Sequence, residues 1–331
     1  MKLQTLAKQL EPDNGTITIN TKSLSSAFSD FLSQYFFAEG KVLEIQGAKL
    51  TQDASSQTVT VTGSASYLNI PNRPLSAHFW IDGQGNVQTS LTYTMIESAT
   101  STRRWAFSNS FPELPLTDIR VKGSKRNEYE RLPCFSNFDF LCANVSVCSQ
   151  AMQDGEFDVP LQEGINFVGQ IRPLGLLGIV EHFLNNDGPQ TVFGPIIIPE
   201  DDTRIVLPNL NQDVSRSTLY PWEIVDYTLP GIHLSMSVPL AFKVGKAEFQ
   251  DTQIRFYSPL KPDMFEPDSP YNIPVCAFTG TLDIPSADMA MDMIADLDIA
   301  DSYLNIEGRF ENFSLENMAK LASITGSGTN S

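Results

Sequence analysis

Short segments in which apolar and polar residues alternate recur along the whole chain and constrain its fold more than any other feature. A period of two places alternate side chains on opposite faces of a β-strand. Gly, Pro, Asn and Asp separate the segments, as expected for turns between strands. The predicted strands are Val42–Leu50, Thr58–Leu68, Leu75–Ile81, Val87–Ile96, Leu116–Lys122, Phe138–Cys148, Ile232–Phe242, Gln253–Ser258, Cys276–Ile284 and Tyr303–Phe310.

Helical spacing of apolar residues is found in three segments. Ser23–Phe36 begins with Ser and Thr residues that can cap a helix. Leu174–Leu184 is followed by an Asn-Asn-Asp-Gly-Pro run, and Ser314–Ile324 is followed by a glycine that favours helix termination. Between the predicted strands, 81–87 contains Asp-Gly and Gly-Asn pairs, which predict a tight hairpin turn.

Two parts of the sequence resemble each other, which predicts an internal repeat. Each part contains the end of a strand, a short turn and an amphipathic helix, although generic strand periodicity is an alternative explanation. We expect two halves, residues 1–160 with the N-terminal helix and residues 161–331 with helices near 174–184 and 314–324. The expected fold is mainly β (α+β), with curved antiparallel sheets in two pseudo-repeated halves and a few amphipathic helices packed on or inside them. The matched positions are Gly169/Gly308, Ile171/Phe310, Leu174/Phe313, Leu176/Leu315 and Ile179/Met318.

The chain is strongly acidic, with 39 Asp and Glu against 22 Lys and Arg and a net charge of −17. This charge disfavours binding to nucleic acid or to an anionic membrane, because both require clustered basic residues. The N-terminal residues lack the apolar core of a secretory signal, and no apolar run reaches the roughly 18 residues of a membrane-spanning helix. A cytoplasmic location is therefore the expectation, with release by a signal-independent route left open.

No cofactor or metal ion is predicted from the Cys and His residues. Cys142 and Cys148 lie in one predicted strand, in which six residues span roughly 20 Å, so a disulfide between them is not expected. The histidines His78, His182 and His233 occupy separate segments without metal-ligand spacing, which favours structural or surface roles.

An acidic run from Asp288 to Asp301 is the densest group of carboxylates. Asp288 and Asp292 would share one face of a helix, and Asp296 and Asp298 one face of a strand. A solvated surface is the favoured interpretation, and a cation site or a catalytic acid pair are the alternatives.

Apolar side chains near the predicted helices and in the Met-rich segment 289–293 supply the candidate ligand contacts. Met adapts to irregular apolar ligands but also fills cores, and helix 23–36 is apolar around much of its circumference. Core packing is therefore the alternative to ligand binding at every one of these positions. The candidate ligand-binding residues are Phe28, Phe31, Leu176, Ile179, Met291 and Met293.

Several pieces of the chain resemble repeat units of large, uncharacterised β-rich proteins of fungi and bacteria. The pieces are Trp105 ahead of Phe111-Pro112-Glu113-Leu114, then Gly164-Ile165-Asn166-Phe167, then the Leu-rich helix Leu174–Leu184. The layout, with helices wrapped by sheet, is also similar to that of the tubular lipid-binding superfamily. This second likeness implies an apolar ligand groove between helix and sheet.

Three functions from different classes fit these features. The first is a non-enzymatic binding module that holds an apolar or lipid-like ligand between sheets and helices. The second is a structural or assembly unit of a larger β-repeat or toxin-associated complex, with a protein partner or a second copy of the chain. The third is an enzyme without a local motif, such as a cyclase or isomerase, for which His182 and Asp296 are candidates. No nucleophile elbow or phosphate-binding loop is present in the sequence.

Overall fold

Strands form most of the structure. The computed structural model describes residues 3–20, 42–53, 55, 57–67, 70–96, 119–122, 129–132, 139–172, 189–197, 227, 229–237, 242–244, 247–259, 275–298, 303–310 and 314–326. The strands are β1 (Thr16–Asn20), β2 (Val42–Asp53), β3 (Thr58–Tyr67), β4 (Ile70–Ile81), β5 (Val87–Ile96), β6 (Ile119–Lys122), β7 (Tyr129–Leu132), β8 (Asp139–Cys148), β9 (Met152–Gln153), β10 (Pro160–Leu161), β11 (Gly164–Arg172), β12 (Gln190–Ile197), β13 (Gly231–Ser237), β14 (Phe242–Val244), β15 (Ala247–Ser258), β16 (Val275–Ile284), β17 (Met289–Asp298) and β18 (Tyr303–Phe310).

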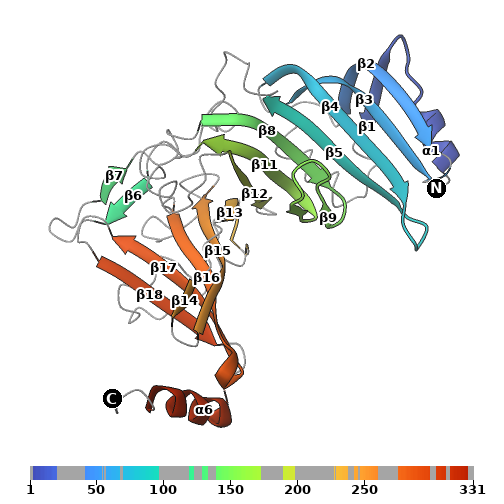
Figure 1. Ribbon diagram of the computed structural model, residues 1–331. Helices are drawn as coiled ribbons and strands as arrows, with labels where there is room; N and C mark the ends of the chain where they lie inside the picture. Colours follow the sequence, from blue (N-terminus) through green and yellow to red (C-terminus); the bar gives the residue numbers. More distant parts are fainter. Residues whose placement is uncertain are drawn as a thin grey trace.

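One antiparallel sheet of 14 strands contains all but four of these elements (Figure 1). Its order is β1-β2-β3-β4-β5-β8-β11-β12-β13-β15-β16-β17-β18, with β14 paired to β15 beside this path. Strands β9 and β10 form one separate hairpin, and β6 and β7 form another. The mainly β fold predicted from the alternation is confirmed.

The two predicted halves both contribute to this single sheet, whereas the sequence suggested separate sheets. The physical link is the pairing of β8 with β11, which joins Cys148 to Gly164 and Phe140 to Ile171. Hairpin strand β10 spans the predicted division at residues 160 and 161. The division into pseudo-repeated halves stays a prediction.

One face of the sheet, called the apolar face below, carries the main core. Its apolar side chains form rows that cross the strands. In one row Leu91 pairs with Val147, Val147 with Ile165, Ile165 with Ile196, and Ile196 with Ile232. Burying each apolar side chain in such a row stabilises the fold by roughly 1.5–3 kcal/mol. The apolar face extends from Ile17 in β1 to Phe256 in β15 as one connected cluster of buried side chains.

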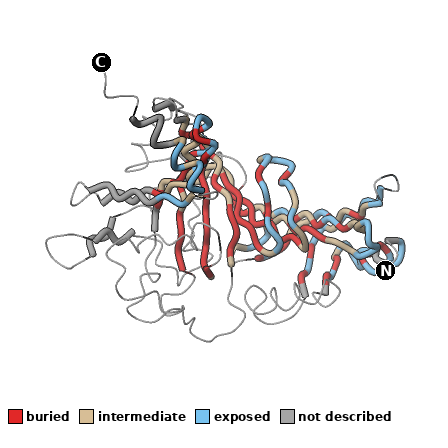
Figure 2. The backbone as a smooth tube through the Cα atoms, turned by 90° about the horizontal axis from the view of Figure 1, so that it is seen from below, coloured by how far each residue is buried: buried red, intermediate tan, exposed pale blue. Residues whose placement is uncertain are grey.

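The opposite face, called the polar face below, is covered at the centre of the sheet by a hairpin. There the hairpin β9–β10 packs Val159 and Leu161 against Cys148 of β8 and Val168 of β11. Figure 2 shows the central strands as buried, whereas strands near the N-terminus alternate buried and exposed positions. The central strands therefore have two covered faces and β1 to β4 have one.

The helices described lie at the two ends of the sheet. The short helix α1 (Leu3–Gln9), which the sequence analysis did not identify, buries Ala7 in the main core. Helix α6 (Leu315–Gly326) confirms the predicted C-terminal helix, and the Oγ of Ser314 accepts a hydrogen bond from the backbone N–H of Asn317 at 3.1 Å. The side-chain amide of Asn317 also donates to the carbonyl oxygen of Asp288 at 3.2 Å, which ties α6 to the turn before β17. No helix among the described residues is long and apolar enough to cross a membrane.

Strand predictions were confirmed where alternation was flanked by a clear turn. Val87–Ile96 and Tyr303–Phe310 match β5 and β18 residue for residue. The predicted strand Ile232–Phe242 covers most of β13 and the first residue of β14, and residues 238–241 between them lie outside the described residues. Predicted helices Ser23–Phe36 and Leu174–Leu184 lie outside the described residues.

The prediction that Asp288 and Asp292 share one face of a helix was wrong. Asp288 has a left-handed conformation (φ 54°) directly after the 3-10 turn η5 (Pro285–Ala287), and Asp292 lies within β17. The pairing of Asp292 with Thr281 of β16 and Arg309 of β18 fixes the extended conformation. Met289, Met291 and Met293 recur at every second position, which is the period of a β-strand, and they lie in β17.

Candidate ligand-binding site on the apolar face

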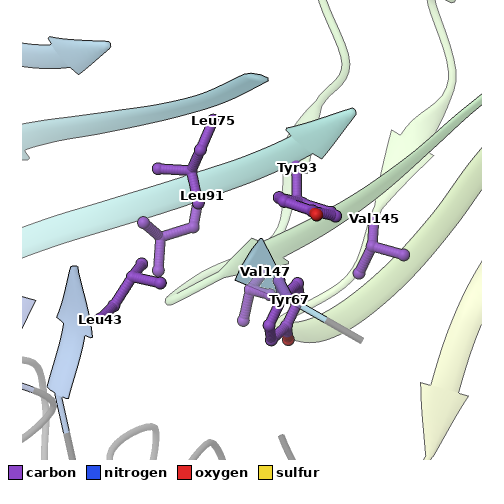
Figure 3. A pocket seen from close by; sticks show the side chains of 7 residues that line it. All are labelled: Leu43, Tyr67, Leu75, Leu91, Tyr93, Val145 and Val147. Atoms are coloured by element: carbon purple, nitrogen blue, oxygen red, sulfur yellow. The ribbon is translucent and has the colours of Figure 1, made fainter. Parts of the chain in front are cut away.

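A cavity on the apolar face is formed by five neighbouring strands, β2, β3, β4, β5 and β8 (Figure 3). The register explains why side chains distant in sequence converge there. Tyr93 pairs with Leu75 on one side and with Val145 on the other, and Leu91 pairs with Val147. The seven lining residues are Leu43, Tyr67, Leu75, Leu91, Tyr93, Val145 and Val147.

Two tyrosine rings complete the wall of this cavity. The rings of Tyr67 and Tyr93 meet edge to face, with centroids 5.2 Å apart and an interplanar angle of 81°. The hydroxyl of Tyr93 donates a hydrogen bond to the carbonyl oxygen of Ile70 at 2.6 Å. This bond turns the hydroxyl toward the backbone at the start of β4, so the ring presents carbon to the cavity.

Burial changes the acidity of both phenols. Loss of hydration raises the pKa of Tyr93 to about 12, and the same cause, with a smaller contribution from Tyr93, raises the pKa of Tyr67 well above its ordinary value. Both groups are therefore neutral throughout the physiological range. The wall offers no charge to a ligand.

The cavity is small in this state. Its volume is about 10 Å³, which is room for about one water-sized molecule. Five of its seven lining residues are aliphatic, so a methyl group suits the space better than water, which needs hydrogen-bonding partners. The cavity can therefore accept one end of an apolar molecule only.

The candidate ligand residues from the sequence are not brought together at this cavity. Phe28, Phe31, Leu176 and Ile179 lie outside the described residues. Met291 and Met293 lie two positions apart on β17, half-buried, opposite Leu282 and Gly280 of β16. They occupy the far end of the sheet from the five cavity strands.

The cavity residues themselves were missed by the sequence analysis. Their strands were predicted, and the alternation places Leu91 and Tyr93 on one face. What the sequence lacked was the strand order, because Leu43 and Val147 are more than a hundred positions apart and meet only through four strand pairings.

A second group of chemically capable side chains lies on the polar face at β13 and β15. Arg255 Nη1 donates a hydrogen bond to the Oγ of Ser235 at 2.6 Å, and Tyr227 shares a hydrogen bond with the same hydroxyl. The guanidinium carbon of Arg255 lies 4.6 Å from the centre of the Tyr227 ring, a cation–π contact. These contacts hold Tyr227 against the sheet.

His233 in the same group has a structural role. With the tautomer assigned from its neighbour, its Nε2 donates to the carbonyl oxygen of Leu229 at 2.6 Å. The hydroxyl of Tyr257 donates to the carbonyl oxygen of Pro230 at 2.9 Å. Both bonds satisfy backbone carbonyls of the segment that leads into β13, so the two side chains act as anchors.

The remaining sequence candidates for chemistry are surface groups or undescribed. His78 lies exposed on β4, with Thr60 and Ser76 hydroxyls 3.0 and 3.1 Å from its two ring nitrogens. Asp292 accepts a hydrogen bond from Thr281 at 3.1 Å and lies 3.9 Å from Arg309, as expected of a solvated face. Within the described residues, no three His, Cys, Asp or Glu side chains are placed to hold a metal ion.

The cysteine prediction is confirmed for the two residues described. Cys142 and Cys148 share strand β8 and are both free thiols. Burial, as the largest cause, raises the pKa of each, to about 12 for Cys148, so neither is a reactive thiolate at neutral pH.

Comparisons with protein-family models, curated proteins and solved structures found no match to this chain.

Proposed function

We propose that the chain is a non-enzymatic binding protein that holds an apolar, lipid-like molecule against the apolar face of its sheet. The observation that carries this proposal is the cavity whose wall is built from Leu, Val and the ring carbons of two tyrosines across five strands. Ligand sites are generally concave and apolar with few polar groups. The neutral wall favours an uncharged chain end over a charged headgroup.

The size of the cavity sets how such a ligand would bind. Space for about one water-sized group admits the terminal methyl of a chain, and the rest of the ligand requires neighbouring side chains to move apart. Strands β2 to β4 have water on their polar face, whereas β8 is covered by the hairpin β9–β10. We therefore expect the side chains of β2, β3 and β4 to move when the ligand binds.

We also propose that the sheet is curved and built from two pseudo-repeated halves, with the predicted helices Ser23–Phe36 and Leu174–Leu184 against its apolar face. Support comes from the matched glycines of the two sequence copies. A Cβ on Gly169 would meet the backbone carbonyl oxygen of Cys142 and the ring of Phe167, and a Cβ on Gly308 would meet the sulfur of Met291, so a large side chain lies against each glycine. Such a layout would enclose a ligand between helix and sheet.

The direct test is native mass spectrometry of the purified protein, with organic extraction of the same sample. A bound apolar molecule of defined mass is the expected result and would identify the ligand. Protein that is empty after expression and also fails to bind added palmitate or the neutral dye Nile red would overturn the proposal.

A pair of variants locates the binding. Leu91→Phe fills the cavity and should weaken saturable Nile red binding by about tenfold, which corresponds to about 1.4 kcal/mol. Thr62→Phe is the matched control, because Thr62 is exposed on the polar face of neighbouring β3. If Leu91→Phe fails to fold, Val145→Ile adds one methyl group to the same wall. Unchanged binding in a folded cavity variant would place the ligand elsewhere.

A further inference from the structure

Thr89 of β5 has a buried hydroxyl on the apolar face of the sheet. Strand β5 pairs with β4 in an unbroken register from Val87 to Tyr93, so Thr89 shares its face with Leu91 and Tyr93, which line the cavity. Thr89 is 3% exposed, and within the part of the chain that the structure describes its Oγ has no hydrogen-bond partner. Buried polar groups are normally paired, so this hydroxyl requires an explanation.

The side chains around this hydroxyl are apolar. On the same face, Val87 and Leu91 flank Thr89 along β5, and Phe79 lies opposite it on β4. All three side chains belong to the main core or pack against it. An ordered water needs roughly two to four polar partners, which these three side chains do not supply. A buried water is therefore a poor partner for Thr89.

The hydroxyl of Ser149, beside Thr89, is used by other groups. Its Oγ accepts a hydrogen bond from the backbone N–H of Thr89 at 2.8 Å and donates its own proton to Gln88 Oε1 at 2.7 Å. The backbone N–H of Ser149 donates to the carbonyl oxygen of Thr89 at 2.9 Å. Ser149 therefore pairs with the backbone of Thr89, and its hydroxyl proton is not available to the Thr89 side chain.

The hydroxyl of Thr89 makes the protein less stable when no ligand is bound. Valine has nearly the same shape as threonine and also favours strands, so it would fill this position without burying a polar atom. In ligand sites, a few buried polar groups in an apolar wall fix the orientation of the ligand. The position of Thr89 next to the cavity gives its hydroxyl that role.

We propose that the apolar ligand carries a neutral oxygen and that this oxygen forms a hydrogen bond with the hydroxyl of Thr89. The inference rests on the proposed function, because it assigns a polar contact to the same site. Leu91 lines the cavity (Figure 3), and Thr89 lies two positions away along β5, a distance of roughly 7 Å. A short alkyl segment therefore separates the end of the ligand in the cavity from its oxygen.

The surroundings of Thr89 define the chemical class of the ligand. A threonine hydroxyl can donate or accept a hydrogen bond, so the oxygen of an alcohol or of a carbonyl group fits. A carboxylate does not fit, because its charge would be buried among apolar side chains beside a single donor. Phe79 lies on β4, one of the strands whose side chains are expected to move, and its displacement would open the way to Thr89. The ligand is thus a neutral, lipid-like alcohol or carbonyl compound.

Competition with Nile red tests this contact in the wild type and in Thr89→Val, with 1-hexanol, 2-hexanone and hexane as probes. The affinity of Nile red itself is measured first for each protein. Thr89→Val should bind the oxygen-bearing probe that fits the site about fivefold more weakly than the wild type, and hexane to within about twofold. A loss for 1-hexanol alone, 2-hexanone alone or both identifies the kind of oxygen.

The stability of the empty protein gives a second readout. Without any probe, Thr89→Val should unfold at a higher urea concentration than the wild type, because it no longer buries an unpaired hydroxyl. Thr89→Ser keeps the hydroxyl and should retain the wild-type preference for oxygen-bearing probes. Thr94→Val is the matched control, since Thr94 lies on the polar face of the same strand, and it should bind all three probes like the wild type.

The outcomes separate this inference from the proposed function. Wild-type protein that binds neither Nile red nor any of the three probes would overturn both. If the wild type binds hexane, and Thr89→Val binds 1-hexanol and 2-hexanone as tightly as the wild type does, the contact with oxygen is wrong and the apolar site remains. A Thr89→Val protein that is unfolded, or less stable than the empty wild type, also rules out the oxygen contact.

Discussion

The hydroxyl of Tyr93 should contribute a measurable and pH-dependent part of the stability. Tyr93 is 2% exposed, and its hydroxyl donates at 2.6 Å to the carbonyl oxygen of Ile70. Tyr93→Phe keeps the ring contact with Tyr67 but leaves that carbonyl without its side-chain donor. We expect a loss of about 1–3 kcal/mol in the free energy of unfolding at pH 7.

The same substitution should matter less at alkaline pH. The pKa of Tyr93 is raised from 10.0 to about 12 in the folded protein. A raised pKa stabilises the fold fully below pH 10 and loses that contribution as pH rises through 12, because the unfolded chain releases its proton first. Two pKa units correspond to about 2.7 kcal/mol, of which about 1.4 kcal/mol is lost by pH 11.

Urea unfolding of wild type and Tyr93→Phe at pH 7, 9 and 11 measures both effects. All other tyrosines are common to the two proteins, so their titration cancels in the difference. The destabilisation by Tyr93→Phe should shrink by about 1.4 kcal/mol between pH 9 and 11. A pH-independent difference, or no difference at pH 7, would show that the hydroxyl is hydrated and that the burial argument is wrong.

Other substitutions test local packing. Gly194→Ala places a Cβ against a backbone carbonyl of neighbouring β13 and should cost at least about 2 kcal/mol by urea unfolding, whereas Gly155→Ala, with open space around it, should be close to neutral. Ser314→Ala removes the cap of α6 and should speed amide hydrogen exchange in its first turn about fivefold, for a loss of about 1 kcal/mol. A hydrogen bond from Gln88, together with the backbone of the turn, lowers the pKa of Asp82 below 3.8. The wild-type hairpin should therefore lose stability as pH falls through that lowered pKa, and Asp82→Ala should lack this acid transition in its thermal unfolding.

Sequence reasoning succeeded where a local rule decides the structure. Val87–Ile96 mostly alternates apolar and polar residues after a Gly-rich turn, and the observed strand has the same bounds. The helix Ser314–Ile324 was predicted from its apolar spacing and the glycine that follows it, and the hydroxyl of Ser314 accepts a hydrogen bond from the backbone N–H of Asn317 at its start. These features depend on neighbours within a few residues.

Sequence reasoning failed where the outcome depends on distant partners. Asp288 and Asp292 have helical spacing, but pairing with β16 and β18 holds this segment extended. His233 could not be distinguished from a surface histidine, because its burial depends on Tyr257, which the pairing of β13 with β15 brings beside it. The cavity could not be located, because no local rule sets the order of β2 to β8.

The unequal burial of the two sheet faces links the proposed site to the fold. The β8 wall of the cavity is clamped from behind by the hairpin β9–β10, and Asn144 bonds across to Glu156 of that hairpin at 3.3 Å. The facing wall of β2 to β4 has only hydroxyl-rich positions such as Thr60 and Thr62 behind it, which solvent reaches. Segments with fewer buried contacts open at lower free energy. When no ligand is bound, the side chains of the two walls can pack against one another and close the cavity. When a ligand binds, β2 to β4 can move away from β8, and the centre of the sheet stays folded. Cavity volume in the empty protein is therefore a poor guide to what this face can hold, and the apolar chemistry of the wall is the better one.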